Sequence, residues 1–435
     1  MKLSQDDAHQ HSDTATRRRG FFYGWWIAIA GSLGMSISSG INYHGFGNFV
    51  IPLSREFGWN RTIISAVVSL ARLQSGLLGP LEGWAVDRLG PRRLALVGIP
   101  LMGLGYILFS KINSLLAFFV VFTLLISLGS SLGFGTPMSA AVANWFKRKR
   151  GLAFGIMWSG VGFGGLFVPA LGWMVDEFGW RDAALSVGIA LLFVGVPLAS
   201  VMRHRPEPYG YLPDGEAPRP PVGRTGATRP SEPDLSQDFT AREAIRTSSF
   251  WFLSFSITVR MLSSGGLGLH LVPYFVGLGA SPVRAAALAG SVGVMSIPGR
   301  FGLSALGDYV NRRYIMAACL ATMATAFVFM GRAADSIGGV IPALLAYAVA
   351  QGGVAVIPQS LVADYFGRRS YATIQGIRGS IQMIGTIAGP VITGYVFDTT
   401  GSYSLAFFGF AGATAISMAL ALMAKPPQRA RRAAR

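Results

Sequence analysis

Charged residues are scarce in this chain, and their scarcity limits the class of protein it can be. Asp, Glu, Lys and Arg make up 13% of its 435 residues, whereas soluble domains carry about 25%. Apolar residues make up 51%, and the mean hydropathy is +0.46. These proportions exclude an ordinary soluble domain and predict a protein that crosses a membrane many times.

Cysteine is nearly absent, and so are the motifs of an enzyme. The single cysteine, Cys319, excludes an internal disulfide, and its apolar surroundings indicate a packing role. The first 19 residues are polar with a basic end, without the short apolar core and cleavage site of a removable signal peptide. The chain has no cluster of metal ligands, no phosphate-binding glycine loop after a strand and no Ser/His/Asp set outside its apolar stretches. We therefore expect no metal, no cofactor and no enzyme activity.

Apolar stretches long enough to span a bilayer recur along the chain, since a span needs about 20 mostly apolar residues. There are twelve of them: Tyr23–Val50, Thr62–Val86, Leu94–Ser110, Ser114–Pro137, Leu152–Trp173, Ala183–Met202, Phe250–Phe275, Ala285–Leu306, Tyr314–Gly331, Gly338–Ala363, Tyr371–Val396 and Leu405–Ala424. The sequence thus predicts an all-α membrane protein with 12 transmembrane helices.

A hydrophilic run, 203–247, separates the sixth stretch from the seventh. It is rich in Pro, Arg and Gly and has no apolar period, so we expect a flexible linker. The chain then divides into an N-terminal tail (1–20), a first six-helix bundle (21–202), the linker, a second six-helix bundle (248–424) and a basic C-terminal tail (425–435).

Lys and Arg are unevenly distributed among the loops, which predicts how the chain lies in its membrane. With the N-terminus inside, only six of the 37 Lys and Arg fall in outer loops and four within spans. The others lie in the tails, the linker and the inner loops, as the positive-inside rule requires. We therefore expect a multi-pass protein of the cell (inner) membrane with both termini cytoplasmic. The formal charge of +17 then reflects attraction to anionic membrane lipid, and no nucleic acid partner is expected.

The two halves of the chain repeat each other. Residues 86–93, Val-Asp-Arg-Leu-Gly-Pro-Arg-Arg, follow the second span as 307–313, Gly-Asp-Tyr-Val-Asn-Arg-Arg, follow the eighth. Trp-Phe at 145–146 precedes the fifth span as Tyr-Phe at 365–366 precedes the eleventh, and both matches have an offset of 220 or 221 positions. A repeat of six spans keeps its orientation, so the halves should be parallel repeats with the substrate bound between them near the midplane.

The loop after the second span resembles the loop motif of the major facilitator superfamily. Its motif residues are Gly83, Asp87, Arg88, Gly90, Arg92 and Arg93. The resemblance extends over nearly the whole chain outside the tails and the linker. It implies two six-helix bundles related by pseudo-two-fold symmetry that work by alternating access. Within the superfamily, Tyr-Gly-Trp-Trp at 23–26 and residues 145–155 are similar to the monocarboxylate transporters. The spacing of Arg300 eight residues before Asp308 resembles that group and the oxalate:formate antiporter.

Four arginines lie within the predicted spans: Arg72, Arg260, Arg300 and Arg378. The only acid clearly within a span, Glu82, is ten residues from Arg72 on one helix, or about 15 Å along its axis, so the two do not neutralise each other directly. Surplus positive charge at membrane depth suits an anionic cargo, because a guanidinium matches a carboxylate in bidentate fashion. We therefore predict that Arg300 binds substrate, the alternative being a structural arginine paired with an acid or a backbone carbonyl.

The resemblance assigns further residues to the site. In the relatives the arginine of span eight binds the carboxylate, which supports Arg300. His270 looks like a histidine in the binding site of bacterial monocarboxylate transporters, and we predict that it couples transport to a proton together with Arg300, the alternative being an interface histidine. The lysine that holds the second carboxylate in the oxalate carrier falls on Gln382 here, and Arg378, one helical turn earlier, could substitute for it.

Span one adds a second polar cluster, His44 beside Tyr43. Mammalian-type monocarboxylate carriers place a lysine near this region, and counting back from Arg55 we find Asn48 there instead. With Arg72 on the first-half side of the cavity, these residues complete the predicted substrate site.

The two loop motifs also predict gates at the cytoplasmic face. We expect Asp87 with Arg92 and Arg93, and Asp308 with Arg312 and Arg313, to form ion pairs across the two halves. Such pairs would hold the outward-open state and break when the carrier opens inward.

Taken together, these residues predict a secondary active transporter of small organic anions. The first hypothesis is symport of a monocarboxylate such as lactate or pyruvate with a proton, for which a monomer suffices. The second is an exchanger of dicarboxylates or other organic anions that uses Arg300 with Arg378. The third is a non-transporting membrane sensor, which the short and Pro-rich linker makes the weakest.

Overall fold

The computed structural model describes residues 21–215, 238–332 and 337–427, and every regular element within them is a helix. The first half contains α1 (Tyr23–Ser38), η2 (Ser39–His44), α2 (Gly47–Phe57), α3 (Arg61–Leu89), α4 (Pro91–Phe109), α5 (Leu115–Val120), η3 (Val121–Ser127), α6 (Leu128–Ser130), η4 (Ser131–Gly135), α7 (Thr136–Trp145), α8 (Arg150–Phe163), η5 (Gly164–Leu166), α9 (Phe167–Ala190), η6 (Leu191–Gly195) and α10 (Val196–Val201). The second half contains α12 (Ser248–Gly277), α13 (Pro282–Pro298), η10 (Gly299–Leu303), α14 (Ser304–Leu306), α15 (Arg312–Arg332), α16 (Ile337–Phe366), α17 (Tyr371–Thr400) and α18 (Ser404–Met423).

These helices account for all twelve predicted spans. Among the described residues, nine continuous helical stretches are long and apolar enough to cross a membrane. One of them, Arg150–Val201, contains two predicted spans, the fifth and the sixth. The chain turns between them at Gly179, whose φ of 82° favours glycine. The first and eighth spans are helical too, the first over α1 with η2 and the eighth over α13 with η10 and α14. Helices suit this setting because they satisfy every backbone polar group without water.

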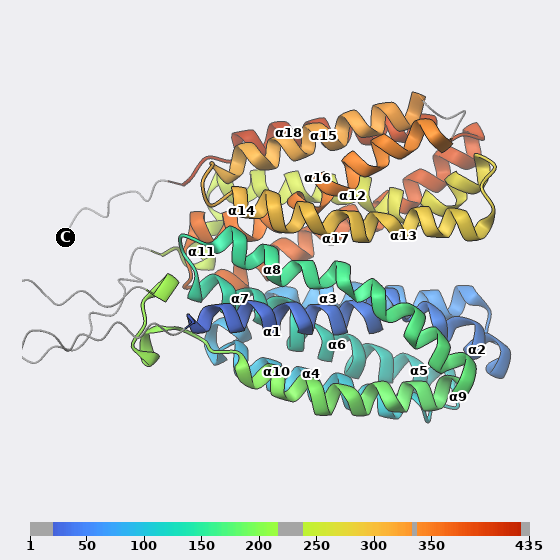
Figure 1. The fold of residues 1–435 in the computed structure, drawn as a ribbon, viewed down its shortest axis with the longest axis horizontal. Helices are drawn as coiled ribbons and strands as arrows, with labels where there is room; N and C mark the ends of the chain where they lie inside the picture. The colour runs from blue at the N-terminus through green and yellow to red at the C-terminus, as the bar shows by residue number, and fades with distance from the viewer. Residues whose placement is uncertain (1–20, 216–237, 333–336, 428–435) are drawn as a thin grey trace, which may run out of the picture.

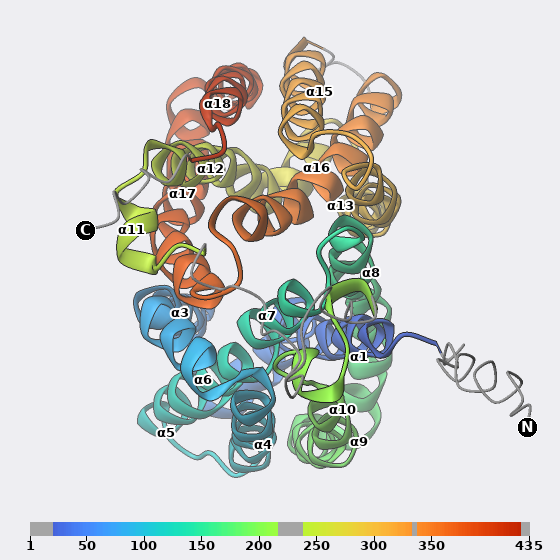
Figure 2. The ribbon, with the colours of Figure 1, turned by 90° about the vertical axis from the view of Figure 1, so that its left-hand side faces the viewer.

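The helices form two groups that lie side by side. In Figure 1 the helices of the second half lie above those of the first, and the described ends of the linker, 203–215 and 238–247, lie at the left. We call this left side the linker end. Viewed from there, α3 lies beside α17, and α8 lies beside α13 and α16 (Figure 2). Span two (α3) therefore packs against span eleven (α17), and span five (α8) against span eight (α13). These two interfaces between the halves are equivalent, as expected for parallel repeats.

Two hydrophobic cores hold the groups together. One consists of second-half side chains only, from Leu253 to Ala424. The other consists mainly of first-half side chains, but also includes Phe366, Tyr371 and Ile374 from the ends of α16 and α17. The two halves are therefore packed against each other at the linker end.

Both described ends of the predicted flexible linker, 203–247, make hydrogen bonds to loops of the two bundles, while its centre, 216–237, lies outside the described residues. Asp214 accepts hydrogen bonds from the backbone N–H groups of Lys147 (3.1 Å), Arg148 (2.7 Å) and Lys149 (3.2 Å). Asp238 accepts them from the N–H groups of Arg368 (2.8 Å) and Arg369 (3.2 Å). The composition of the linker did not reveal these contacts, because a carboxylate that binds a distant loop leaves no periodic pattern in the sequence.

The two anchored loops are equivalent in the repeat. The loop at 147–149 precedes helix five, and the loop at 368–369 precedes helix eleven. After Asp238, residues 241–245 form the short helix α11 (Ala241–Ile245), which begins with a capping box between Thr240 and Glu243. Each end of the linker thus fastens one half of the molecule at the same symmetry-related position.

Candidate functional site

Arg300 belongs to the second half but reaches the first. It lies in the π-helical turn η10, which continues α13. Its Nη1 donates a hydrogen bond to the backbone oxygen of Trp158 on α8 at 2.8 Å, and its Nε donates to Ser296 Oγ at 3.1 Å. Turns of the π type are rare and often mark functional positions in helices. The structure therefore places this guanidinium on the boundary between the two halves.

Glycines bring the neighbouring backbones close to Arg300. A Cβ at Gly155 on α8 would lie 2.7 Å from the carbonyl oxygen of Arg300. A Cβ at Gly352 on α16 would lie 2.8 Å from its backbone nitrogen, and one at Gly299 would collide with the carbonyl oxygen of Val349. The turn around Arg300 is thus packed between α8 and α16, which fixes where the side chain starts.

A second arginine, Arg260, lies close to Arg300. It extends from α12, is only 2% exposed, and donates from Nη1 to Gln351 Oε1 on α16 at 2.8 Å. Its Nη2 lies 3.3 Å from the thioether sulfur of Met261, a weak acceptor, and its Nε has no partner. Arg260 lies within electrostatic range of Arg300 and of Tyr347 on α16. The site therefore contains two guanidinium groups.

The first half contributes Tyr43 and His44 from the π-helical turn η2. Both lie within electrostatic range of Arg300, although His44 is exposed and Tyr43 is 64% exposed. The exposed Arg72 of α3 joins them, with its Cζ 5.2 Å from the centre of the Tyr43 ring. These three side chains are exposed whereas Arg300 is half-buried, so the site is accessible from the side that Tyr43, His44 and Arg72 occupy.

The site has cations but no acid to balance them. Among the described ion pairs, none involves Arg260, Arg300 or Arg378. Glu82, the acid inside span two, is 5% exposed and instead accepts a hydrogen bond from Ser131. An arginine is effectively always charged, so the buried Arg260 and the half-buried Arg300 together require an anion from elsewhere.

Arg378 and Gln382 lie apart from this cluster. Arg378 of α17 is 1% exposed, donates to Gln375, and has Tyr371 as its electrostatic neighbour. Tyr371 begins α17 at the linker end and is in ring contact with Phe154 of α8. Gln382, one turn beyond Arg378, is half-buried. Arg260 is thus the arginine within electrostatic range of Arg300, whereas the exchanger hypothesis used Arg378.

His270 and Asn48 find their hydrogen-bond partners within their own halves. His270 is in contact with the hydroxyl of Tyr403 (3.3 Å) and the carbonyl oxygen of Pro390 (3.2 Å), both in the second half. It lies ten residues beyond Arg260 on α12, or about 15 Å along the helix axis. Asn48 donates to the carbonyl oxygen of Val168 at 3.1 Å, within the first half. Both side chains occupy interfaces between helices of one half.

The predicted gate residues lie at the linker end, but their partners differ from those expected. Asp87 accepts hydrogen bonds from the backbone N–H groups of Ala372 (3.0 Å) and Thr373 (2.8 Å) at the start of α17. Asp308 accepts them from Gly151 (2.6 Å) and Leu152 (2.9 Å) at the start of α8. The free N–H groups of a helix N-terminus and its dipole favour a carboxylate, so each acid binds the other half through backbone. The loop motif carries no sign of this, because any residue supplies an N–H.

The basic gate residues separate into two groups. Arg312 binds both Asp308 and Asp364 within the second half, and Asp364 in turn binds Arg150 of the first half at 2.5 Å. Arg92 and Arg93 are exposed and have no ion pair among the described residues. The Arg88 guanidinium lies 5.4 Å from the ring of Trp84, and Arg313 lies over the ring of Tyr314. Among the described residues, the ion pair that joins the two bundles is therefore Arg150–Asp364.

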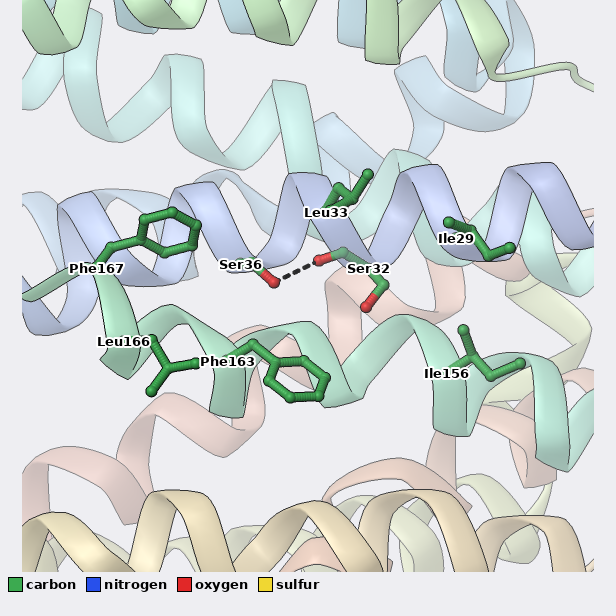
Figure 3. A pocket seen from close by; sticks show the side chains of 8 residues that line it. All are labelled: Ile29, Ser32, Leu33, Ser36, Ile156, Phe163, Leu166 and Phe167. Atoms are coloured by element: carbon green, nitrogen blue, oxygen red, sulfur yellow. Dashed lines mark hydrogen bonds between the residues drawn. The ribbon is translucent and has the colours of Figure 1, made fainter.

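An apolar hollow lies elsewhere, between α1 and α8 (Figure 3). Its lining consists of Ile29, Ser32, Leu33, Ser36, Ile156, Phe163, Leu166 and Phe167. One of its two serines, Ser36, donates to the carbonyl oxygen of the other, Ser32, at 2.9 Å. None of the charged residues of the site lines it. A shallow apolar surface of this kind on a membrane protein suits lipid chains rather than an anion.

Sequence reasoning identified Arg260 as an arginine within a span but left it out of the site. Nothing local distinguished it from Arg72 or Arg378, and its companions Gln351 and Tyr347 are neutral residues 91 and 87 positions away. The available signal was the set of four arginines with a single acid. Which two of them meet depends on how α12, η10 and α16 pack.

A family model and the similar curated proteins point to the same family. A model of the Major Facilitator Superfamily matches residues 33–345 and 253–435. Monocarboxylate transporter 13 of Bos taurus is 25% identical over 389 residues, which cover 88% of this chain and 85% of that protein. Monocarboxylate transporter 12-B of Danio rerio is 25% identical over 410 residues, which cover 89% and 85%.

Solved structures share the fold at lower identity. The human organic anion transporter TETRAN superposes with a TM-score of 0.65 at 17% identity, covering 92% of this chain and 98% of that one. The Escherichia coli fucose:proton symporter FucP superposes with a TM-score of 0.68 at 13% identity, covering 92% and 98%. The predicted all-α fold of 12 transmembrane helices in two bundles is confirmed. The chain belongs to the Major Facilitator Superfamily of multi-pass membrane transporters and is monocarboxylate transporter-like.

Proposed function

We propose that this protein is a secondary active transporter of small organic anions that moves a monocarboxylate of the lactate or pyruvate type together with a proton. The observation that carries the proposal is Arg300, a guanidinium on the boundary between the halves that is held by a carbonyl oxygen and a hydroxyl but by no carboxylate. A planar guanidinium binds a carboxylate through two parallel hydrogen bonds. The cargo would therefore supply the anion that the site lacks.

For the proton we favour His44 over His270. His44 is exposed and within electrostatic range of Arg300, whereas His270 is engaged with Tyr403 and Pro390 near the other end of α12. An imidazole near the cargo can change charge in the physiological pH range. A protonated His44 would repel an empty Arg300, so proton and carboxylate would enter as a neutral pair.

The remaining parts of the proposal concern orientation and movement. We place the linker end in the cytoplasm of the cell, where its excess of Lys and Arg meets anionic lipid. The contacts made by Asp87 and Asp308 and the Arg150–Asp364 pair then close the cytoplasmic side, so this conformation faces outward. A first bundle at 21–202 and a second at 248–424 can supply both sides of the site, so the proposal takes a monomer as the working unit.

The test is uptake into proteoliposomes that contain the purified protein. Radiolabelled L-lactate or pyruvate is added with an inwardly directed proton gradient, and the expected result is accumulation that a protonophore abolishes. Arg300→Gln should reduce uptake to the level of empty liposomes. His44→Gln should abolish accumulation driven by the gradient while exchange of labelled for unlabelled substrate continues, and His270→Gln should retain both.

Two results would overturn parts of the proposal. If no short monocarboxylate is taken up under any gradient, the substrate class is wrong. If counterflow is rapid and a protonophore has no effect, the protein is an exchanger and the proton has no role.

A further inference from the structure

Arg260 is a buried cation for which a monocarboxylate provides no partner. Its Nη1 has a neutral amide oxygen, its Nη2 has a sulfur atom, and its Nε has nothing. A single carboxylate bound to Arg300 would compensate one of two positive charges. The other would remain at membrane depth, where an uncompensated charge costs several kcal/mol by insertion scales.

The surroundings of Arg260 are arranged to orient it rather than to neutralise it. Gln351 Oε1 accepts from Arg260 Nη1 at 2.8 Å and also lies 3.3 Å from Ser264 Oγ, which comes from the next turn of α12. Gln351 is adjacent to Gly352, the glycine that lets α16 approach the backbone of Arg300. The same short segment of α16 therefore holds the Arg260 guanidinium and the backbone of Arg300, and it does so with neutral atoms.

From these contacts we infer that Arg260 binds a second anionic group of the cargo, so that the site accepts dicarboxylates and holds them between Arg300 and Arg260. The inference rests on the proposed function, because it assumes that Arg300 binds the first carboxylate. It extends the cargo range beyond monocarboxylates and assigns Arg260 as the residue that determines the preference. Gln351 is then a positioning residue that holds the Arg260 guanidinium toward the site.

The test compares ligands that differ only in the second charge. Succinate and its monoamide succinamate have nearly the same shape, and so do malonate and malonamate, and oxalate and oxamate. Each ligand competes with labelled monocarboxylate for the wild-type protein in proteoliposomes, at a pH where both carboxylates of the diacids are ionised. We expect at least one diacid to bind about tenfold or more tightly than its monoamide, which corresponds to about 1.4 kcal/mol.

Variants then locate the preference. Arg260→Gln should bring the ratio between the best diacid and its monoamide close to one, while inhibition by the monoamide changes less than about threefold. Arg260→Lys retains the charge and should retain part of the preference. Arg284→Gln, which removes an exposed arginine near the start of α13, is the matched control and should leave the ratio unchanged.

The outcomes are separable. Equal binding of every diacid and its monoamide by the wild-type protein would overturn the inference, even if Arg260→Gln failed to fold. A preference that survives in Arg260→Gln would overturn the assignment to Arg260. Failure of all organic anions, mono- and dicarboxylates alike, would instead refute the proposed function, so the two failures differ.

Discussion

At the scale of single residues, the important property of Arg300 is the kind of partner it has. A guanidinium that pairs with an acid inside the membrane is a structural element, because its charge is already compensated. Arg300 instead donates to a carbonyl oxygen of the other half and to a serine hydroxyl. Those partners orient the fork but leave its charge for a ligand.

Arg300→Lys should lower the affinity for a carboxylate about tenfold or more, although the charge is kept. A lysine ammonium cannot form two parallel hydrogen bonds, and hydrogen bonds to charged groups contribute about 1.5–3 kcal/mol each. The measurement is a thermal-shift titration with short organic anions. Arg284→Lys serves as the control. If the anion concentration at the midpoint of the titration is unchanged in Arg300→Lys, the carboxylate binds elsewhere.

His204, outside the membrane spans, should make stability depend on pH. Burial and the nearby Arg205 and Arg368 lower its pKa from 6.5 to about 4 in the folded protein. The folded state therefore favours the neutral ring. The contribution of His204 to the free energy of unfolding is complete above pH 6.5 and is lost as the pH falls toward 4. His204→Gln, which cannot titrate, should show a flatter fall in melting temperature over this range, and identical slopes for the two proteins would contradict the assignment.

At the scale of helices, the glycines of α8 have two different tasks. A Cβ at Gly151 would collide with the carbonyl oxygen of Ser304 in the other half, whereas one at Gly160 would collide with that of Ser32 in the same half. The first contact must break when the linker end opens, and the second need not. Glycine here permits close backbone approach both at a moving seam and within a fixed bundle.

Gly151→Ala should shift the population toward a conformation open at the linker end. Gly160→Ala should lower the melting temperature without such a shift, because overpacking within one bundle costs about 1–3 kcal/mol. Single cysteines introduced at each end, in a Cys319→Ala background, report opening through their rate of thiol labelling. Equal labelling patterns for the two variants would show that α8 does not distinguish a moving face from a fixed one.

The anchored ends of the linker can be tested in the same way. Asp214→Ala should speed amide hydrogen exchange at Lys147–Lys149 about tenfold or more, because three N–H groups lose one acceptor. Asp238→Ala should do so at Arg368 and Arg369 and leave the first loop unchanged. Exchange that accelerates at both loops in either variant would mean that the linker acts as one unit.

At the scale of the whole molecule, the two halves are joined at one end and open at the other. Side chains of α16 and α17 enter the first-half core at the linker end. Asp87 and Asp308 each cap a helix of the opposite half there, and Arg150–Asp364 adds a charged contact. The opposite end has the exposed Tyr43, His44 and Arg72. Alternating access requires this asymmetry to invert.

Asp87→Asn and Asp308→Asn should each favour opening at the linker end, and the double variant should favour it more than either. A carboxylate at a helix N-terminus contributes about 0.3–1 kcal/mol at exposed positions and up to ~2 kcal/mol when partly buried. Distances between spin labels on the two halves at the linker end measure the shift. If one substitution alone gives the full shift, the two symmetric contacts are not equivalent.

The sequence by itself determined the fold. Twelve apolar stretches, a hydrophilic run between the sixth and the seventh, and an offset of 220 or 221 residues between matching loop motifs led to two six-helix bundles, because span length and backbone satisfaction in lipid are local constraints. It also identified Arg300, since a charge within an apolar run is visible without any structure.

Only the tertiary structure decided which residues meet. It placed Arg260 within electrostatic range of Arg300. It also gave Asp87 and Asp308 backbone partners in the opposite half and attached Asp214 and Asp238 to loops far away in the chain. Such contacts depend on the rotation and depth of each helix, and these are set by the packing of its neighbours. A periodic pattern shows which face of a helix is apolar, but it does not show which polar group lies opposite.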